Sequence, residues 1–231
     1  MGPDKFADHV AFFEPRNMQP NASLPEKIRH AGITIDDKWE PGDLGLLIHL
    51  HGVQNFQDYG FNAIHEAYCA KIAAEFILNP HKDRSFGWIA RKGGEVVGSV
   101  LVVERPENQA QLRLLFVSKS VRGIGLGRWL VEEAVRYSAS GGFGRIYLWT
   151  IAGLDRAISI YQSVGFMQSD EKLIEEWGMS STELRFDLDL RTDERGNAAK
   201  DMLFRGQDPT ALATPAHRLS SSLPPEDPAQ P

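Results

Sequence analysis

The chain has 231 residues and a formal net charge of −6, from 25 basic and 31 acidic side chains. This balance excludes a protein that binds nucleic acid through a general basic surface, because such binding needs an excess of Lys and Arg. Hydrophobic residues make up 42% and charged residues 24%, as in ordinary globular proteins. The length suits one well-cored domain.

Cysteine content and hydropathy indicate the compartment. Cys69 is the only cysteine, so no intrachain disulfide can form, and a reducing environment is expected. No run of 18 apolar residues is present, and residues 1–20 lack the apolar core of a signal peptide. We therefore expect no membrane partner and a cytoplasmic location.

Proline marks the edges of the predicted domain. Four of the 13 prolines precede residue 26, and six follow residue 190. Residues 191–231 are polar and aperiodic, and such a segment buries too little apolar area to offset its ordering entropy. We interpret 1–30 as an N-terminal extension, 31–190 as the folded domain and 191–231 as a flexible tail.

Two amphipathic helices are predicted after a short strand at 32–39. The first starts at Asp43, and its apolar face follows helical spacing through Leu44, Leu47, Ile48 and His51. The second starts after Asn62, which suits an N-cap. Its apolar residues recur at every fourth position, at Ile64, Tyr68, Ile72 and Phe76.

Strands then alternate with helices. Strands are predicted at 86–91, 95–104 and 110–118, with a Lys-Gly-Gly hairpin turn at 92–94. A helix follows to about Ser138, then a strand at 145–150, a helix that ends at Gly165, and a closing strand at 181–190. One more strand is expected between the last helix and the closing strand, so that the predicted order is β-α-α-β-β-β-α-β-α-β-β, which is a mixed α/β class.

The segment LRLLFVSKSVRGIGLGRWLVEE (112–133) passes from a strand through three glycines into a helix. N–H groups at such a helix start bind phosphate oxygens when glycines leave them unobstructed. The Walker A pattern is absent, and Arg128 stands where the dinucleotide fingerprint needs glycine. The segment does match Arg-x-x-Gly-x-Gly, at Arg122, Gly125 and Gly127. A tight turn without a ligand is the alternative.

These residues resemble the loop motif of the GNAT superfamily of acyl-CoA-dependent N-acetyltransferases. The later segment AISIYQSVGF (157–166) is similar to the family pattern Ala-x-x-x-Tyr-x-x-x-Gly-Phe. More narrowly, HGVQNFQDYGF, LRLLFV, LWT and LRFDLDL resemble the acetyltransferase half of MarR-type fusion proteins, of which this chain looks like a stand-alone version. The resemblance implies an α/β (α+β) fold with a mixed, mostly antiparallel central sheet flanked by helices.

The resemblance also implies acetyl-CoA as co-substrate, without a metal. The pyrophosphate would lie on the loop and the pantetheine arm along the preceding strand end. The predicted cofactor-binding residues are Leu115, Phe116, Val117, Arg122, Gly123, Ile124, Gly125, Leu126, Gly127 and Arg128.

Two residues receive catalytic roles from the same resemblance. The Leu115 N–H would stabilise the oxyanion of the tetrahedral intermediate, worth roughly 3 kcal/mol for one donor. Tyr161 would protonate the departing thiolate, because a phenol of pKa about 10 can donate to a thiolate of pKa about 8.5 when the two are hydrogen-bonded. The alternatives are a plain core strand at Leu115 and a packed core aromatic at Tyr161.

Two positions depart from the family pattern. Leu154 replaces an asparagine that family members often have before the second motif. Gln111 replaces a glutamate base found in some members, and its amide cannot take a proton. The base is therefore unassigned. Candidate acceptor-site residues on the first two helices are Glu66, His51 and Tyr59. The sequence favours a core histidine at His51 and a solvated glutamate at Glu66, leaves Tyr59 open, and allows water to relay the proton equally well.

The sequence thus predicts an N-acetyltransferase in which a primary amine attacks acetyl-CoA directly. The predicted acceptor is a small-molecule amine or amino acid, with a protein lysine or N-terminus as second choice, and a homodimer is left open. Cys69 is a weak nucleophile candidate, since no dyad accompanies it. The alternative is an acyl-CoA-binding sensor or structural module with little or no turnover, which the missing glutamate favours mildly.

Overall fold

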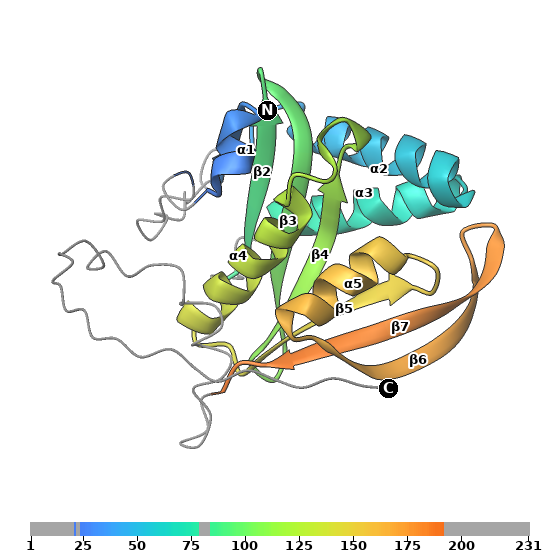
Figure 1. Ribbon diagram of the computed structural model, residues 1–231. Helices are drawn as coiled ribbons and strands as arrows, with labels where there is room; N and C mark the ends of the chain where they lie inside the picture. Colours follow the sequence, from blue (N-terminus) through green and yellow to red (C-terminus); the bar gives the residue numbers. More distant parts are fainter. Residues whose placement is uncertain (1–20, 22–23, 79–83, 192–231) are drawn as a thin grey trace, which may run out of the picture.

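The computed structural model describes residues 21, 24–78 and 84–191. Its centre is a seven-stranded sheet in the order β1-β2-β3-β4-β5-β7-β6, with helices on both sides (Figure 1). All neighbouring strands are antiparallel except β4 and β5, which are parallel. The predicted tail lies outside the described residues apart from its first residue, Arg191.

The elements follow the predicted order, with a short helix added at the start. In chain order they are α1 (Glu26–His30), β1 (Ile33–Asp36), α2 (Asp43–Tyr59), α3 (Ala63–Leu78), β2 (Phe86–Lys92), β3 (Glu95–Arg105), β4 (Gln109–Val117), a 3₁₀ turn (Lys119–Val121), α4 (Leu126–Ser140), β5 (Arg145–Ile151), α5 (Asp155–Val164), β6 (Met167–Glu176) and β7 (Met179–Asp189). Leu24 and Ile28, which the sequence interpretation placed in the N-terminal extension, are buried in the core.

Each face of the sheet has its own apolar core. On one face α1, α4 and α5 pack over Val100 and Val102 of β3. On the other face α2 and α3 pack over Leu101 and Val103 of the same strand. Because β3 is covered on both faces, its sequence EVVGSVLVVE is apolar almost without interruption rather than alternating.

Helix α3 corrects one prediction. Ile64 is 63% exposed and Tyr68 is 37% exposed, so the first half of the predicted apolar stripe is wrong, whereas Ile72 is buried and Phe76 packs against the core. The residues that α3 buries are His65, Cys69, Ile72 and Ala73. The helix is apolar around most of its circumference, so the row starting at Ile64 could not be told from the neighbouring row by spacing alone. The predicted N-cap is confirmed, because Asn62 Oδ1 accepts a hydrogen bond from the Ile64 N–H at 3.0 Å.

The sheet is split between β4 and β5. The two strands pair only from Gln109 opposite Arg145 to Gln111 opposite Tyr147, after which β5 continues beside β7 alone. The pairing of β4 with β3 shifts register in the same region, and Leu114 there has φ +45°. The section 112–117 of β4 therefore has no partner strand on the β5 side.

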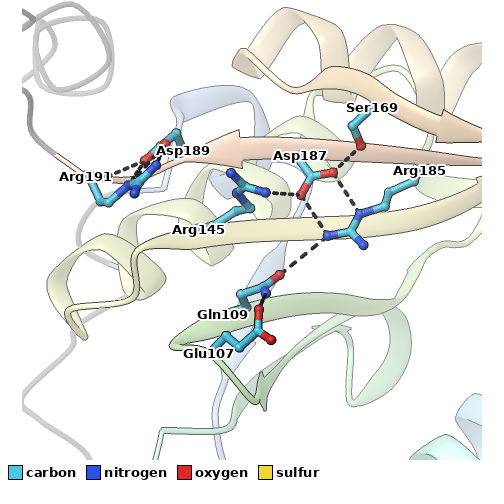
Figure 2. Close-up of polar contacts among 8 residues, drawn as sticks. All are labelled: Glu107, Gln109, Arg145, Ser169, Arg185, Asp187, Asp189 and Arg191. Atoms are coloured by element: carbon cyan, nitrogen blue, oxygen red, sulfur yellow. Dashed lines mark hydrogen bonds and ion pairs between the residues drawn. The ribbon is translucent and has the colours of Figure 1, made fainter.

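A polar network joins the strands where the sheet is still closed (Figure 2). Asp187 of β7 accepts hydrogen bonds from Arg185 at 2.8 and 3.0 Å and from Ser169 of β6, and it lies 3.6 Å from Arg145 of β5. Arg185 also donates to Gln109 of β4 at 3.5 Å. Burial acts to raise the pKa of Asp187, but the hydrogen bonds from Arg185 and Ser169 outweigh it and lower that pKa. The network ties four strands together at the apex of the split.

Candidate functional site

A cavity of about 1110 Å³ lies in the split between β4 and β5. The unpaired section of β4 and the end of β5 form its floor, and the turn before α4 and the first turns of α4 and α5 line one half. Side chains from α2, α3 and the tip of the β6–β7 hairpin line the other half. Of the predicted cofactor residues, all except Ile124 line the floor or the first half; Ile124 is half-buried and packs against the core instead. Two of the predicted acceptor residues, His51 and Tyr59, belong to the second half.

The glycine loop presents the start of α4 to this cavity. Gly123 has φ +83° and Gly125, the N-cap of α4, has φ +94°, a conformation that side chains disfavour. A Cβ on either would meet nothing within 4 Å, so both glycines are needed for conformation and not for space. The first N–H groups of α4 have no partner inside the helix, which makes this end suitable for a phosphate.

Gly127 has a different role from the other two loop glycines. A Cβ at this position would lie 3.3 Å from Ile160 Cδ1 and 3.4 Å from Val117 Cγ2. The missing side chain therefore lets α4 approach both α5 and β4, which brings the loop next to the unpaired strand.

The two predicted arginines of the loop both have carboxylate partners. Arg122 lies 3.1 Å from Asp58 of α2, and Lys119 lies 2.5 Å from the same carboxylate. The hydrogen bond from Lys119 lowers the pKa of Asp58 against a smaller effect of burial. Arg128 pairs with Glu132 one turn along α4, at 2.7 Å, and its side chain is 55% exposed. Arg122 thus fixes the loop against α2, whereas Arg128 extends the positive charge at the loop's outer edge.

The end of β4 has a free backbone edge along which an extended ligand could bind. Phe116 turns its side chain into the core beneath α2 and α3, while Leu115 and Val117 pack at the edge of the core under α4 and α5. All three line the cavity. The Val117 carbonyl accepts hydrogen bonds from Gln54 at 3.3 Å and Arg122 at 3.4 Å. The unpaired strand edge, the helix-start amides and the cavity volume together fit an acyl-CoA.

Tyr161 of α5 is a cavity wall residue and a core residue at once. It is 5% exposed, and its ring centroid lies 6.1 Å from that of Phe166 and 6.3 Å from that of Phe186. Burial raises the pKa of its phenol well above the usual 10. The hydroxyl therefore stays protonated into alkaline solution, as a proton donor requires.

His51 of α2 is buried at the strained turn of β4. Its ring lies 5.2 Å from that of Phe116, and its Nε2 is buried without a hydrogen-bond partner. Burial, reinforced by nearby His65, lowers the pKa of His51 to about 4, against an opposing hydrogen bond to the Leu114 backbone. The ring is therefore neutral at pH 7 and keeps a lone pair.

The other two predicted acceptor residues differ in position. Tyr59 lines the cavity and is 40% exposed. Glu66 does not line it, because its carboxylate lies over Gly52 of the neighbouring helix, 2.8 Å from the place of a Cβ there. Gln111 is buried on β4, and its Oε1 accepts a hydrogen bond from Arg105 at 2.8 Å.

Several cavity residues were missed by the sequence interpretation. We call four of them the aromatic cluster: Phe61, His65, Tyr68 and Trp177. Trp177 stands at the tip of the β6–β7 hairpin with φ +57°, and its carbonyl accepts the Asn62 N–H at 2.9 Å. Arg113 of β4 also lines the cavity. Of these residues, only Arg113 could have been noticed in the sequence, because it is a charged residue inside the apolar run LRLLFV.

Cys69 is unsuited to act as a nucleophile. Its Sγ lies 3.8 Å from His65 Nε2, but burial raises the pKa of the thiol to about 12, with only partial opposition from Arg113. Among the described residues, no group of three or more His, Cys, Asp or Glu side chains could hold a metal ion. Nor does the described part of the chain contain a helix of the length and apolarity needed to cross a bilayer.

The split sheet, the glycine loop and the helix order define a GNAT-type acetyltransferase fold. Residues 53–166 match the model of the acetyltransferase (GNAT) family. This match and the fold support a GNAT superfamily acetyltransferase. The narrower likeness to MarR-type fusion proteins stays a prediction.

Individual relatives agree with this assignment. Over 129 residues the chain is 34% identical to the Mus musculus protein described as probable N-acetyltransferase family 8 member 5, covering 54% of this chain and 55% of that one. Across the first three curated relatives, the match spans from 39% to 55% of their length.

Two solved structures share the fold. The Escherichia coli ribosomal-protein-S18-alanine N-acetyltransferase superposes with a TM-score of 0.55 at 18% identity, covering 71% of this chain and 97% of that one. The Vibrio cholerae spermidine N-acetyltransferase, solved with CoA and spermine, gives a TM-score of 0.54 at 19% identity, covering 69% and 96%.

Proposed function

We propose that this protein transfers the acetyl group of acetyl-CoA to a primary amine by direct attack. One observation carries the proposal: the unpaired edge of β4 and the start of α4 open into the same cavity. The α4 amides would bind the pyrophosphate, with Arg128 adding charge at the outer edge. The free edge of β4 would hold the pantetheine arm by backbone hydrogen bonds.

Each step of the proposed reaction is assigned to a group in the cavity. The neutral amine attacks the thioester carbon, a C–N bond forms, and the Leu115 N–H stabilises the oxyanion. The C–S bond then breaks, and Tyr161 donates its proton to the departing thiolate. Loss of a proton from the amine nitrogen completes the amide.

His51 is the proposed acceptor of that last proton. His51 lines the cavity and lies beside Leu114, whose backbone has a positive φ, and its buried Nε2 has no hydrogen-bond partner within the described residues. A ring with a pKa of about 4 does not deprotonate a free ammonium of pKa about 10. It can take the proton after attack, because the nitrogen is far more acidic once it carries the acyl group. The base thus comes from α2 and not from position 111.

The proposed acceptor is a small amine or amino acid, with a protein lysine or N-terminus as second choice. The two structural neighbours act on spermidine and on a ribosomal protein, so their shared fold serves both kinds of acceptor. No nucleic-acid or membrane partner is proposed, and the proposed location is the cytoplasm. A binding module without turnover is the second candidate, favoured by the amide at Gln111, which is already bonded to Arg105.

The test combines turnover and binding. Release of free CoA thiol is followed with a panel of amines, and CoA affinity is measured by calorimetry. Arg128→Glu should weaken CoA binding about 10-fold or more, because a carboxylate replaces a cation beside the phosphate site. Arg29 is an exposed residue of α1, and Arg29→Glu is the matched control, which should bind CoA as tightly as the wild type. Gly125 is a poorer target, since any side chain there strains the backbone.

The outcomes separate the two candidates. Turnover of any primary amine supports the transferase. Tight CoA binding without turnover of any amine supports the binding module. Equal CoA affinity of the Arg128→Glu variant and the wild type would contradict the assigned phosphate site.

A further inference from the structure

Arg113 occupies a special place in the acceptor half of the cavity. It lies on the unpaired section of β4, two residues before Leu115. Its half-buried side chain reaches towards α3, where Nη2 donates to the Tyr68 hydroxyl at 2.8 Å. Its guanidinium carbon lies 5.2 Å from the centroid of the Tyr68 ring.

Most of the other cations around the cavity have a carboxylate partner. Arg122 and Arg128 of the lining each pair with one, and Lys172 of β6 pairs with Glu183 of the lining at 2.8 Å. Arg156 in the first turn of α5 also makes no ion pair within the described residues, but it lies in the cofactor half of the cavity. Within the described residues, Arg113 makes no ion pair, and the Tyr68 phenol is its hydrogen-bond partner. A guanidinium has five N–H donors, and the Tyr68 hydroxyl accepts from only one of its nitrogens. An anion is the ligand that such a group binds best.

The aromatic cluster forms an apolar wall beside this cation. The ring of Tyr68 lies 5.6 Å from that of Trp177, which lies 5.5 Å from Phe61 and 5.0 Å from His65. His65 is neutral at pH 7, because burial lowers its pKa to about 4. The aromatic cluster can therefore contact an apolar group of a ligand without adding a charge of its own. The Arg113 guanidinium lies at the edge of this cluster, next to Tyr68.

We propose that Arg113 and Tyr68 bind a carboxylate of the acceptor, which is an α-amino acid with an apolar or aromatic side chain. This inference rests on the proposed function and narrows its substrate class. Arg113 lies two residues before Leu115 on the same unpaired section of β4, and both line the cavity, so a carboxylate on the Arg113 side chain and an amine near the Leu115 N–H can belong to one small molecule. The aromatic cluster contacts the side chain. A peptide N-terminus or a protein lysine has no carboxylate next to its amine, so both are poorer acceptors.

The experiment compares acceptors that differ only at the carboxylate: L-phenylalanine, L-phenylalaninamide and 2-phenylethylamine. Rates are expressed as kcat/KM per neutral amine, which removes the differences in amine pKa. The wild type should prefer phenylalanine by about 10- to 100-fold, the size of a charge-assisted hydrogen bond. Arg113→Met should abolish this preference and Arg113→Lys should restore part of it. Arg29→Met, at an exposed residue of α1, should keep the wild-type preference for phenylalanine.

The failure of this inference is distinguishable from failure of the proposed function. If the three acceptors react equally in the wild type, or if Arg113→Met keeps the preference, the carboxylate site is wrong while the transferase stands. If none reacts, binding of N-acetylphenylalanine and of N-(2-phenylethyl)acetamide to the CoA-loaded protein still tests Arg113. Tighter binding of the acid, lost in Arg113→Met, supports the site, and equal binding overturns it.

Discussion

Replacing Tyr161 by phenylalanine removes one hydroxyl from the wall of the cavity and leaves the ring. The ring contacts with Phe166 and Phe186 stay, and within the described residues the hydroxyl makes no protein hydrogen bond that would be lost. We therefore expect a change in unfolding free energy within about 0.5 kcal/mol, as for substitutions that disturb no packing or hydrogen bond. For a chain of this size that is a shift in Tm of about 1–2 °C.

The effect on rate should be far larger than the effect on stability. A lost general acid costs roughly 100- to 10,000-fold, and water that enters the space of the hydroxyl recovers part of it. We expect kcat to fall roughly 10- to 1000-fold with little change in KM for acetyl-CoA, because the lost interaction exists only as the thiolate departs.

The pH profile gives a second readout of Tyr161. Burial raises the pKa of the phenol above 10, so the donor form persists across pH 6–10. An acceptor amine of pKa about 10 becomes neutral over the same range. The rate of thiol release should therefore rise with pH without a falling limb. A near-wild-type kcat in Tyr161→Phe would make this tyrosine a packing residue, and a falling limb that disappears in the variant would show that its pKa is not raised.

Two further changes test the base and the apex of the split. His51→Gln should lower kcat/KM for the acceptor roughly 10- to 1000-fold while CoA affinity by calorimetry stays unchanged; an unaltered rate would leave proton removal to water. Asp187→Asn should lower the free energy of unfolding in urea by about 1–3 kcal/mol at pH 7, because the charge-assisted bonds from Arg185 are lost. The folded-state pKa of Asp187 is lowered, so its contribution is complete above the unfolded pKa of about 3.9 and disappears as the pH falls through the folded value. The two proteins should therefore converge in stability at acid pH, and a constant difference down to pH 2 would contradict this account.

Most of the fold could be predicted because each element has a periodic or turn signal. The Gly93-Gly94 turn and the Asn62 cap are local, and local chemistry decides them. The buried face of α3 could not be predicted in the same way. Ile64 and His65 begin equally regular rows, and only the position of α2 and of the cavity decides that the first turns of α3 bury His65 and Cys69 rather than Ile64 and Tyr68.

The site was predictable where it is continuous in sequence and not where distant segments meet. The loop at 122–128 lies in one segment, and the motif that includes Tyr161 lies in another, so patterns reveal them. The φ of +45° at Leu114 has no marker, since glycine or asparagine would be the usual residue there. Trp177 reaches the acceptor half only because the β6–β7 hairpin, which begins at Met167, folds back on α3, which ends at Leu78. No local sequence pattern carries this tertiary contact.

The short pairing of β4 with β5 also bears on how the native state opens. Three residue pairs join the four strands β1–β4 to the three strands β5–β7, and within each group neighbouring strands are antiparallel. Cooperative opening follows lines of sparse contact, so these groups are the natural units of amide exchange in the ligand-free protein. A molecule that lies between β4 and β5 contacts both groups of strands when they are folded and does not bind the unfolded chain. Its binding therefore stabilises the two groups together. Ligand binding would then merge two units of local unfolding into one.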